Sequence, residues 1–363
     1  MSEIAVVVGT RPEIIKMSPV IRSCDRHGVD YFILHTGQHY SFDLDEVFFR
    51  ELGLPEPRYD LKVGSGSDIA QVARILYRIE KILIEEKPEV VLVEGDTNTV
   101  LAAGLASSRL GIRAGHVEAG LRSGDRSMPE EINRTLTDHL SDYLFAPTQL
   151  ARENLLREGI PGEKIFVTGN TIVDAVNEYS PLALTRDKLL EELDLESEGF
   201  LLLTLHRQEN VDDAVRLREI FHGLSLVYEE LGLPILFPVH PRTRKNMRRF
   251  RPGTITGLRL IQPVGFIDFL LLEEKSRLIL TDSGGIQEEA CILGTPCVTL
   301  RESTERPESL EVGANVLAGW KAPSVLAAVK EGLERKGIWN NPFGDGRAGE
   351  RIIQILKEAN QSR

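Results

Sequence analysis

The feature that most limits the fold of this chain is a regular alternation of short apolar runs with longer helical patterns. Ile4–Val8 is apolar throughout, which is typical of a strand buried on both faces of a sheet. Residues 13–27 follow, with apolar side chains along one helix face. The same pattern predicts strands over 30–35, 90–93, 113–117, 143–146 and 164–167. Strands separated by helical stretches of about ten residues or more form βαβ units and a parallel sheet.

The alternation starts again after Asp174. Strands are expected over 200–205, 234–238, 258–261, 278–280, 296–299 and 315–317, and a last helix over 347–359. Residues 177–199 are charged and weakly patterned, so we expect a linker and a peripheral helix there. A chain of 363 residues is too long for one ordinary core. The sequence therefore predicts an α/β protein with two doubly wound domains, 1–174 and 175–346.

The composition limits the class of protein. Hydrophobic residues make up 42% and charged residues 27%, which are globular values, and no apolar run reaches the ~18 residues of a membrane span. The N-terminus, MSEIAVVVGT, lacks a basic region, so no signal peptide is expected. Cys24, Cys291 and Cys297 form neither a disulfide framework nor a metal motif, which favours a cytoplasmic protein without a metal. A net charge of −12 argues against a general nucleic-acid binder.

The stretch 278–294, LILTDSGGIQEEACILG, predicts a strand, a glycine turn and a helix start. The first N–H groups of such a helix lack intrahelical partners and attract anions. Gly284 and Gly285 would let a phosphate approach the backbone, and Ser283 could add a hydroxyl donor. Glu289 could reach a ribose diol. The alternative is a simple turn with a helix cap.

Most unusual polar clusters follow a predicted strand, and ligands of doubly wound sheets bind at that edge. Arg11 and Lys16 follow the first strand, and they either balance a diphosphate or are solvated cations. Asp96 could be a helix cap. Glu118 stands where a strand enters a turn, and a buried carboxylate there needs a partner or a shifted pKa. Two facing edges of this kind would make an interdomain cleft.

Three further residues have either a role in the site or a purely structural role. Glu130 begins a predicted helix after Pro129, where acids also complement the helix dipole, and it is better placed than Glu131 to face a cleft. His206 follows the strand at 200–205 and suits a diphosphate beside the Ser-Gly-Gly loop, or is a satisfied histidine. Arg306 is a phosphate ligand or a surface ion pair. No GxSxG, GxxxxGK[ST] or GxGxxG motif occurs.

Several long motifs resemble the non-hydrolysing UDP-N-acetylglucosamine 2-epimerases. They occur in the family's order over essentially the whole chain: GTRPEIIKMSP, GDTNTVLA, GHVEAGLRSGDRSMPEEINR, FVTGNTIVDA, TLHRQEN, LTDSGGIQEEACILGTP, TERPE and NPFGDG. The resemblance implies the glycosyltransferase-B architecture, which has two Rossmann-like domains, an active-site cleft between them and a C-terminal helix, here 347–363, that returns to the first domain. It also implies a cytoplasmic homodimer that needs no cofactor and serves polysaccharide biosynthesis.

The resemblance implies reversible interconversion of UDP-N-acetylglucosamine and UDP-N-acetylmannosamine. The C2 proton of the sugar is not acidic, so the family eliminates UDP to give 2-acetamidoglucal and then adds UDP back. Carried over by motif, the catalytic residues would be Asp96, Glu118, Glu130 and His206. The acid and base roles among the carboxylates stay open. The residues that would hold the UDP-sugar are Arg11, Lys16, Asp96, Glu118, His206, Phe269, Ser283, Gly284, Gly285, Glu289 and Arg306.

The resemblance leaves alternatives. Substrate activation in many members involves a Gln-His-Arg sequence. This chain has Gln38 and His39, but Tyr40 stands where those members have the arginine. Related enzymes act on UDP-2,3-diacetamido-glucuronate, whose carboxylate would need an extra cation. A UDP-sugar-dependent glycosyltransferase of the same architecture would need an acceptor site, and residues 50–62 show no basic or amphipathic segment. A non-catalytic nucleotide-sugar binder would not need the carboxylates of Asp96, Glu118 and Glu130, and all three are present.

Overall fold

The computed structural model describes residues 4–38, 48–186, 188–253, 255–335, 337 and 339–361. His39 and Tyr40, on which the argument about substrate activation rests, lie outside these residues. The chain divides into two compact units. Unit 1 is Met1–Ala175 together with Phe343–Arg363, and unit 2 is Val176–Pro342.

Unit 1 is built on a parallel sheet with the strand order β3-β2-β1-β4-β5-β6-β7. Its strands are β1 Ile4–Val8, β2 Tyr31–His35, β3 Tyr59–Asp60, β4 Val90–Glu94, β5 Arg113–Val117, β6 Tyr143–Ala146 and β7 Ile165–Val167. All five residues of β1 are buried, as the apolar run predicts, because β2 and β4 pair with it on either side. The short pairing of β3 with β2 carries too little apolar pattern to be found in the sequence.

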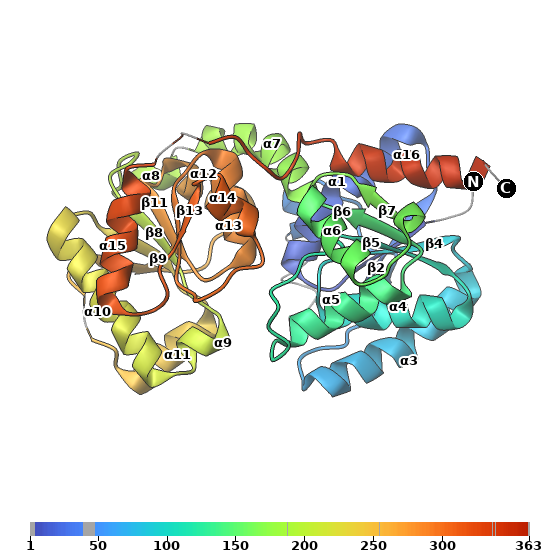
Figure 1. The fold of residues 1–363 in the computed structure, drawn as a ribbon, viewed down its shortest axis with the longest axis horizontal. Helices are drawn as coiled ribbons and strands as arrows, with labels where there is room; N and C mark the ends of the chain where they lie inside the picture. The colour runs from blue at the N-terminus through green and yellow to red at the C-terminus, as the bar shows by residue number, and fades with distance from the viewer. Residues whose placement is uncertain are drawn as a thin grey trace. The chain divides into compact units, whose positions relative to one another are not determined.

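Helices cover both faces of this sheet. They are α1 Arg11–His27, α3 Asp68–Glu86, α4 Asn98–Leu110, α5 Pro129–Leu140, α6 Gln149–Arg157, η1 Gly162–Lys164 and α16 Ala348–Gln361. The last helix, α16, packs on α1 (Figure 1). A Cβ atom on Gly349 would lie 2.7 Å from the backbone of Pro19, so glycine permits this close approach. The carboxylate of Asp174 accepts hydrogen bonds from the N–H groups of Ala348 and Gly349, at 3.1 and 2.9 Å, and so caps α16.

Unit 2 repeats the design with the parallel strand order β10-β9-β8-β11-β12-β13. Its strands are β8 Leu201–Thr204, β9 Ile235–Pro238, β10 Leu258–Ile261, β11 Leu278–Thr281, β12 Cys297–Thr299 and β13 Asn315–Leu317. Its helices are η2 Leu184–Arg186, α8 Lys188–Glu192, α9 Gln208–Val211, α10 Ala214–Leu231, α11 Pro241–Phe250, α12 Phe266–Lys275, α13 Gly284–Leu293, α14 Pro307–Glu311 and α15 Ala322–Leu333. The helix α7 Thr171–Ala183 leads from unit 1 into unit 2.

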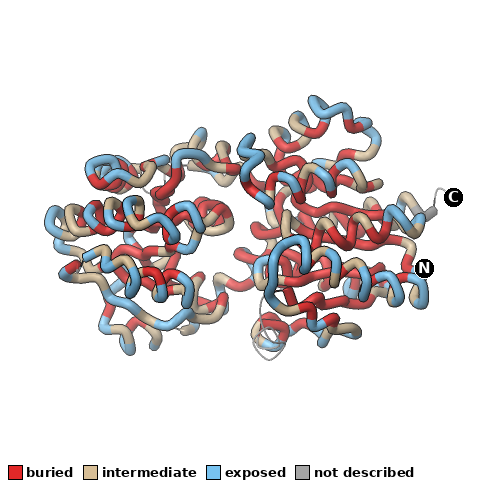
Figure 2. The backbone as a smooth tube through the Cα atoms, turned by 90° about the horizontal axis from the view of Figure 1, so that it is seen from below, coloured by how far each residue is buried: buried red, intermediate tan, exposed pale blue. Residues whose placement is uncertain are grey.

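The two Rossmann-like α/β domains expected from the sequence are confirmed, and the predicted strands lie within a residue or two of the observed ones. In both units the strands form a buried interior, and the helices expose their outer faces (Figure 2). The segment 177–199 is more helical than expected, because α7 continues to Ala183 and is followed by η2 and α8. Gly284 and Gly285 belong to the first turn of α13 instead of a preceding loop.

The strand order reverses beside β1 in unit 1 and beside β8 in unit 2, since each of these strands has neighbours from both directions of the chain. The carboxyl ends of the strands at such a switch point are the usual ligand sites of doubly wound sheets. The active-site cleft between the domains stays a prediction. Within the described residues, every helix is too short or too polar to cross a membrane.

Candidate functional site

The unit 1 candidates lie after β1, β4 and β5, which are neighbours in the sheet. Lys16, in the second turn of α1, forms an ion pair with the carboxylate of Glu118, which follows β5. The ammonium of Lys16 also lies 3.5 Å from Oε1 of Glu94, the last residue of β4. All three side chains are buried. The structure therefore places Lys16 between two carboxylates, whereas the sequence suggested either a diphosphate or solvent as its partner.

Sequence analysis did not select Glu94 or Glu13, yet both belong to this cluster. Burial raises the pKa of Glu94 well above its usual value, and the neighbouring Glu118 raises it further against the opposing effect of Lys16. Glu13 is also fully enclosed, and burial raises its pKa to about 7 although it accepts a hydrogen bond from the N–H of Gly9 at 2.5 Å. Their positions, Glu94 at the end of β4 and Glu13 in the first turn of the helix that follows β1, were the signal that could have identified them.

Glu118 adopts φ = +69°, a left-handed conformation that residues other than glycine rarely take. Such strain tends to persist at functional sites, where the surrounding structure holds it. Here the next N–H group, of Ala119, donates to the carbonyl of Phe145 at 3.2 Å. The buried His116 precedes Val117 in β5. Its Nδ1 lies 2.6 Å from the carboxylate of Asp138, and its Nε2 lies 2.8 Å from the carbonyl oxygen of Gly95. His116 thereby links β5 to the turn that carries Asp96.

Asp96 lies in the turn between β4 and α4 and forms an ion pair with Arg134 of α5. The other guanidinium nitrogen of Arg134 donates to Glu131 at 2.8 Å. Glu131 is buried and also accepts hydrogen bonds from the N–H groups of Ser123 and Gly124, each at 3.0 Å. Glu131 therefore fixes a loop, and Glu130 in the same first turn of α5 is only half-buried. Sequence analysis did not single out Arg134 either.

Arg11 is the first residue of α1 and lies in a different environment from Lys16. Its guanidinium carbon lies 4.6 Å from the centre of the Phe48 ring, which is a cation–π contact. The half-buried guanidinium is therefore held at the helix N-terminus. A cation in this position adds to the positive end of the helix dipole, so an anion would be attracted to both.

In unit 2, His206 follows β8 and is oriented by Asp282, which follows the neighbouring strand β11. Nδ1 of His206 lies 3.1 Å from the Asp282 carboxylate. That carboxylate also accepts hydrogen bonds from the N–H groups of His206 and Arg207, at 3.0 and 2.9 Å. Burial would raise the pKa of Asp282, but His206 and these hydrogen bonds outweigh it and lower the pKa. The histidine side chain is 43% exposed, so Asp282 holds an accessible imidazole in place.

The start of α13 combines an N-terminal helix end with an arginine. The Ser283 side chain makes no capping hydrogen bond. A Cβ atom on Gly284 would lie 3.3 Å from the guanidinium carbon of Arg306, so this arginine lies against the first turn of the helix. A Cβ atom on Gly285 would meet only Ser283 Oγ, at 3.9 Å. The helix end and the guanidinium place two sources of positive potential together, as a phosphate site requires.

A buried ionic network supports Arg306. Its Nε donates to Glu288 of α13 at 2.8 Å. Nearby Arg301, which is buried, donates to both carboxylate oxygens of Glu305 and through Nε to Glu209 at 3.0 Å. Burial would raise the pKa of Glu305, but Arg306 and Arg301 outweigh it and lower the pKa to about 2. The segment 301–306 that follows β12 is thus fixed by charges, and sequence analysis identified only Arg306 from it.

Glu289 and Phe269 lie on two helices that pack together. Glu289 is a buried residue of α13, and the fully buried Glu273 belongs to α12. Burial raises the pKa of Glu273 well above its usual value, and the neighbouring Glu289 raises it further. Phe269, also on α12, is half-buried. The contact of Glu289 with the ribose and the contact of Phe269 with the base therefore stay predictions.

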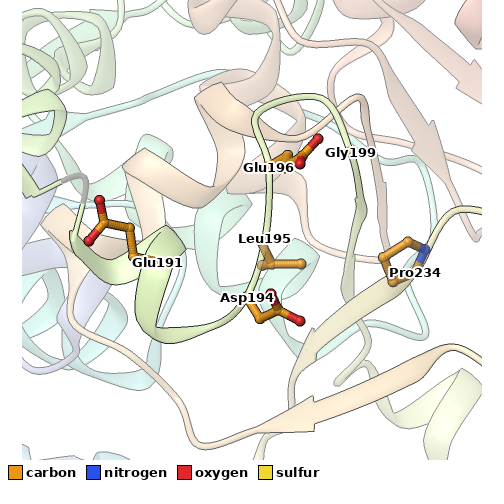
Figure 3. A pocket seen from close by; sticks show the side chains of 6 residues that line it. All are labelled: Glu191, Asp194, Leu195, Glu196, Gly199 and Pro234. Atoms are coloured by element: carbon orange, nitrogen blue, oxygen red, sulfur yellow. The ribbon is translucent and has the colours of Figure 1, made fainter.

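A surface pocket of unit 2 lies away from these residues. It is lined by Glu191, Asp194, Leu195, Glu196, Gly199 and Pro234 (Figure 3). Gly199 and Pro234 precede β8 and β9, so the pocket lies at the amino ends of the strands, opposite the edge that carries His206. Its three carboxylates would repel a diphosphate. In the part of the chain that the structure describes, no group of three or more His, Cys, Asp and Glu is placed to hold a metal ion.

Comparisons with known proteins place this chain among nucleotide-sugar enzymes. The family profile described as UDP-N-acetylglucosamine 2-epimerase matches residues 22–357. A UDP-N-acetylglucosamine 2-epimerase of Methanocaldococcus jannaschii is 51% identical over 360 residues, which cover 98% of each chain. A crystal structure of the UDP-GlcNAc 2-epimerase from that organism, in complex with UDP-GlcNAc and UDP, matches with a TM-score of 0.93 over 98% of this chain and 99% of that one. A Pseudomonas aeruginosa UDP-2,3-diacetamido-2,3-dideoxy-D-glucuronate 2-epimerase is 40% identical over 98% of this chain and 99% of its own.

Proposed function

The chain belongs to the UDP-N-acetylglucosamine 2-epimerase family, and from this premise we propose that it interconverts UDP-N-acetylglucosamine and UDP-N-acetylmannosamine. The observation that carries the proposal is the buried acid–base cluster of Glu118 and Lys16 at the carboxyl end of the unit 1 sheet. A C2 epimerase must remove a proton from carbon and return it to the opposite face. Carboxylates whose charge is set by burial and by one ammonium group suit that task.

We propose that the reaction proceeds by elimination and re-addition. The C2 proton moves to a carboxylate, the C1–O bond breaks with its electron pair leaving on UDP, and 2-acetamidoglucal forms. UDP then adds back while a proton is delivered to the other face of C2. Asp96, Glu118 and Glu130 are the candidate acids and bases. Arg134 would hold the Asp96 carboxylate in place, because it is ion-paired to it.

The groups of unit 2 suit the departing diphosphate. Elimination places negative charge on UDP, which donors and cations stabilise in the transition state. The α13 N-terminus with Ser283, Gly284 and Gly285 supplies N–H and hydroxyl donors, and Arg306 supplies a fixed cation. His206 is held through Nδ1 by Asp282, which leaves Nε2 to protonate or hydrogen-bond the leaving oxygen. Arg11, Glu289 and Phe269 complete the proposed substrate-binding set.

The identity of the sugar is supported by sequence similarity. The relative that acts on UDP-2,3-diacetamido-2,3-dideoxy-D-glucuronate is 40% identical, compared with 51% for the UDP-N-acetylglucosamine 2-epimerase. Its substrate carries an additional carboxylate, which a matching site would pair with a cation. In the acid–base cluster of unit 1, the ammonium of Lys16 is already engaged by Glu94 and Glu118. We therefore propose the neutral N-acetyl sugar.

The proposal is tested by incubating the purified protein with UDP-N-acetylglucosamine alone and following the anomeric signals by NMR. We expect a second UDP-sugar, UDP-N-acetylmannosamine, to reach the same final ratio from either starting epimer. No acceptor should be needed, which separates an epimerase from a glycosyltransferase. The proposal is wrong if both nucleotide sugars stay unchanged, or if only UDP-2,3-diacetamido-glucuronate is converted.

We also propose a homodimer that forms through α3 and α5. These helices expose apolar side chains: Ile69 (84% exposed), Tyr77 (82%) and Ile84 (52%) on α3, and Ile132 (44%) and Leu136 (47%) on α5. Large apolar side chains exposed to solvent in this way support a protein interface. Ile69→Asp with Tyr77→Asp should yield a monomer by analytical ultracentrifugation, whereas Val215→Asp, at an exposed apolar position of α10, should not. An unchanged sedimentation coefficient in the double variant would exclude this interface.

We propose that the protein acts in the cytoplasm and serves polysaccharide biosynthesis. All three of its cysteines are free and buried, which suits a reducing compartment. Fractionation of cells that express the full chain tests the location, and loss of N-acetylmannosamine from surface polysaccharide on deletion tests the role. Recovery of the protein outside the cytoplasm, or unchanged polysaccharide, would contradict these two proposals respectively.

A further inference from the structure

Glu94 is enclosed within a small charged cluster and contacts the proposed acid–base residue. It is 2% exposed at the end of β4, and Glu118 beside it is 8% exposed. The two carboxyl groups meet at the same ammonium group, that of Lys16. Lys16 serves both, through its ion pair with Glu118 and at 3.5 Å from Glu94. The titratable groups that act on Glu94 are therefore Lys16 and Glu13 of α1 and Glu118 after β5.

The number of protons in this cluster follows from its charges. Ionised carboxylates only accept hydrogen bonds, so Glu94 and Glu118 can hydrogen-bond to each other only when one of them holds a proton. Two ionised carboxylates beside a single ammonium would also leave a net negative charge in a buried site, which is costly. One proton for two carboxyl groups leaves the group of Glu94, Glu118 and Lys16 electrically neutral.

We propose that Glu94 is a positioning residue that holds this proton and that Glu94 and Glu118 act as one proton-sharing pair. This inference rests on the proposed epimerase function. Glu94 donates a hydrogen bond to the Glu118 carboxylate and keeps it ionised and oriented beside Lys16. Burial of Glu94 and its raised pKa agree with this assignment.

The pair makes the proton transfer balance within the cluster. When the C2 proton reaches Glu118, both carboxyl groups of the pair are protonated. The group of Glu94, Glu118 and Lys16 then carries one positive charge, which is that of the Lys16 ammonium. The C1–O electron pair leaves on UDP at the same time, so a positive charge appears in the enzyme as a negative charge appears on UDP. On re-addition the pair returns a proton and is singly protonated again. Neither an oxidant nor a cofactor is consumed.

The test is infrared spectroscopy of the unliganded protein, combined with the pH profile of kcat. Glu94→Gln keeps an N–H donor for Glu118 but holds no titratable proton. The wild-type minus Glu94→Gln difference spectrum at neutral pH should show the C=O stretch of a protonated carboxylic acid that shifts in D2O. The same variant should lose the alkaline limb of the kcat profile and about tenfold or more of kcat, with UDP affinity unchanged.

Two further variants keep the test decisive. Glu118→Gln leaves Glu94 alone beside Lys16, so Glu94 should ionise and the same protonated band should vanish even if Glu94→Gln does not fold. Glu89→Gln, just before β4 at a partly exposed carboxylate, should leave the band and the kcat profile unchanged. A difference spectrum that shows loss of an ionised carboxylate would overturn the proposal. The band is read without substrate, so a wild-type protein that shows the band but does not epimerise would contradict only the proposed function.

Discussion

The carboxylate of Asp282 lies 3.1 Å from Nδ1 of His206 and accepts hydrogen bonds from the N–H groups of His206 and Arg207. Asp282→Asn would keep the size of the side chain but lose the negative charge that fixes the imidazole and its tautomer. We expect kcat to fall on the order of 100-fold, with UDP affinity within about twofold of the wild type.

Steady-state kinetics and calorimetric UDP titration check this expectation. Asp213→Asn is the matched control, because Asp213 caps α10 on the exposed surface and asparagine caps helices about as well. Equal losses of kcat in both variants would mean that Asp282 has no special relation to His206. A loss of UDP affinity with unchanged kcat would assign Asp282 to binding alone.

Gly284 should be intolerant of a side chain because Arg306 lies against it. A Cβ atom there would lie 3.3 Å from the guanidinium carbon, so Gly284→Ala would push the arginine from the start of α13. We expect UDP to bind about tenfold more weakly, which corresponds to about 1.4 kcal/mol. Gly162→Ala, where the nearest atom lies 3.8 Å from the added Cβ, should bind UDP like the wild type. Unchanged UDP affinity in Gly284→Ala would exclude this arrangement.

The raised pKa of Glu13, from 4.5 to about 7, makes stability depend on pH. The folded state holds this proton more tightly than the unfolded state, so the contribution is fully present below about pH 4.5 and is lost as pH rises to about 7. The full change is on the order of 3 kcal/mol. Glu13→Gln should therefore lose less stability than the wild type between pH 4.5 and 8, as measured by urea midpoints. Identical midpoint changes in the two proteins would show that folding does not raise the pKa of Glu13.

Two buried glutamates of unit 2 should differ in how much stability their replacement by glutamine costs. Glu273 has a raised pKa, which favours its neutral form, so Glu273→Gln should cost less than about 1 kcal/mol of unfolding free energy. Glu305 has a pKa lowered to about 2 by the arginines around it, and Glu305→Gln leaves buried Arg301 with only the more exposed Glu209 as a charged partner. We expect that change to cost about 3–5 kcal/mol. Chemical unfolding of the two variants compares them directly, and equal costs would contradict these charge states.

Much of the fold could be predicted because local pattern and final environment agree. Ile4–Val8 reads as a strand buried on both faces, and the sheet places β2 and β4 on either side of it. The sequence did not predict β3, because this strand has only two residues and pairs along one edge only. The charged sequence of 177–199 predicts a linker and a peripheral helix, but charge alone does not reveal how far α7 continues.

The site was only partly predictable. Placement after strands identified Glu118 and His206, but the partner of each comes from a distant part of the chain. Lys16 lies 102 residues from Glu118, and Asp282 lies 76 residues from His206. A sequence motif shows which residue types are present. It does not show which distant side chain sets the charge of each residue, because that depends on how the strands are ordered in the sheet. Glu94 is the clearest case, since its proton depends on contacts with two other elements.

The central claim is that the sugar is epimerised by removing and returning the C2 proton, and deuterium incorporation tests it most directly. Wild-type protein, UDP-N-acetylglucosamine and D2O are incubated until the epimer appears, and both nucleotide sugars are examined by NMR and mass spectrometry. We predict that the UDP-N-acetylmannosamine formed carries one deuterium, located at C2, and that Glu118→Gln abolishes this exchange while still binding UDP. An epimer that retains protium at C2 would contradict the account.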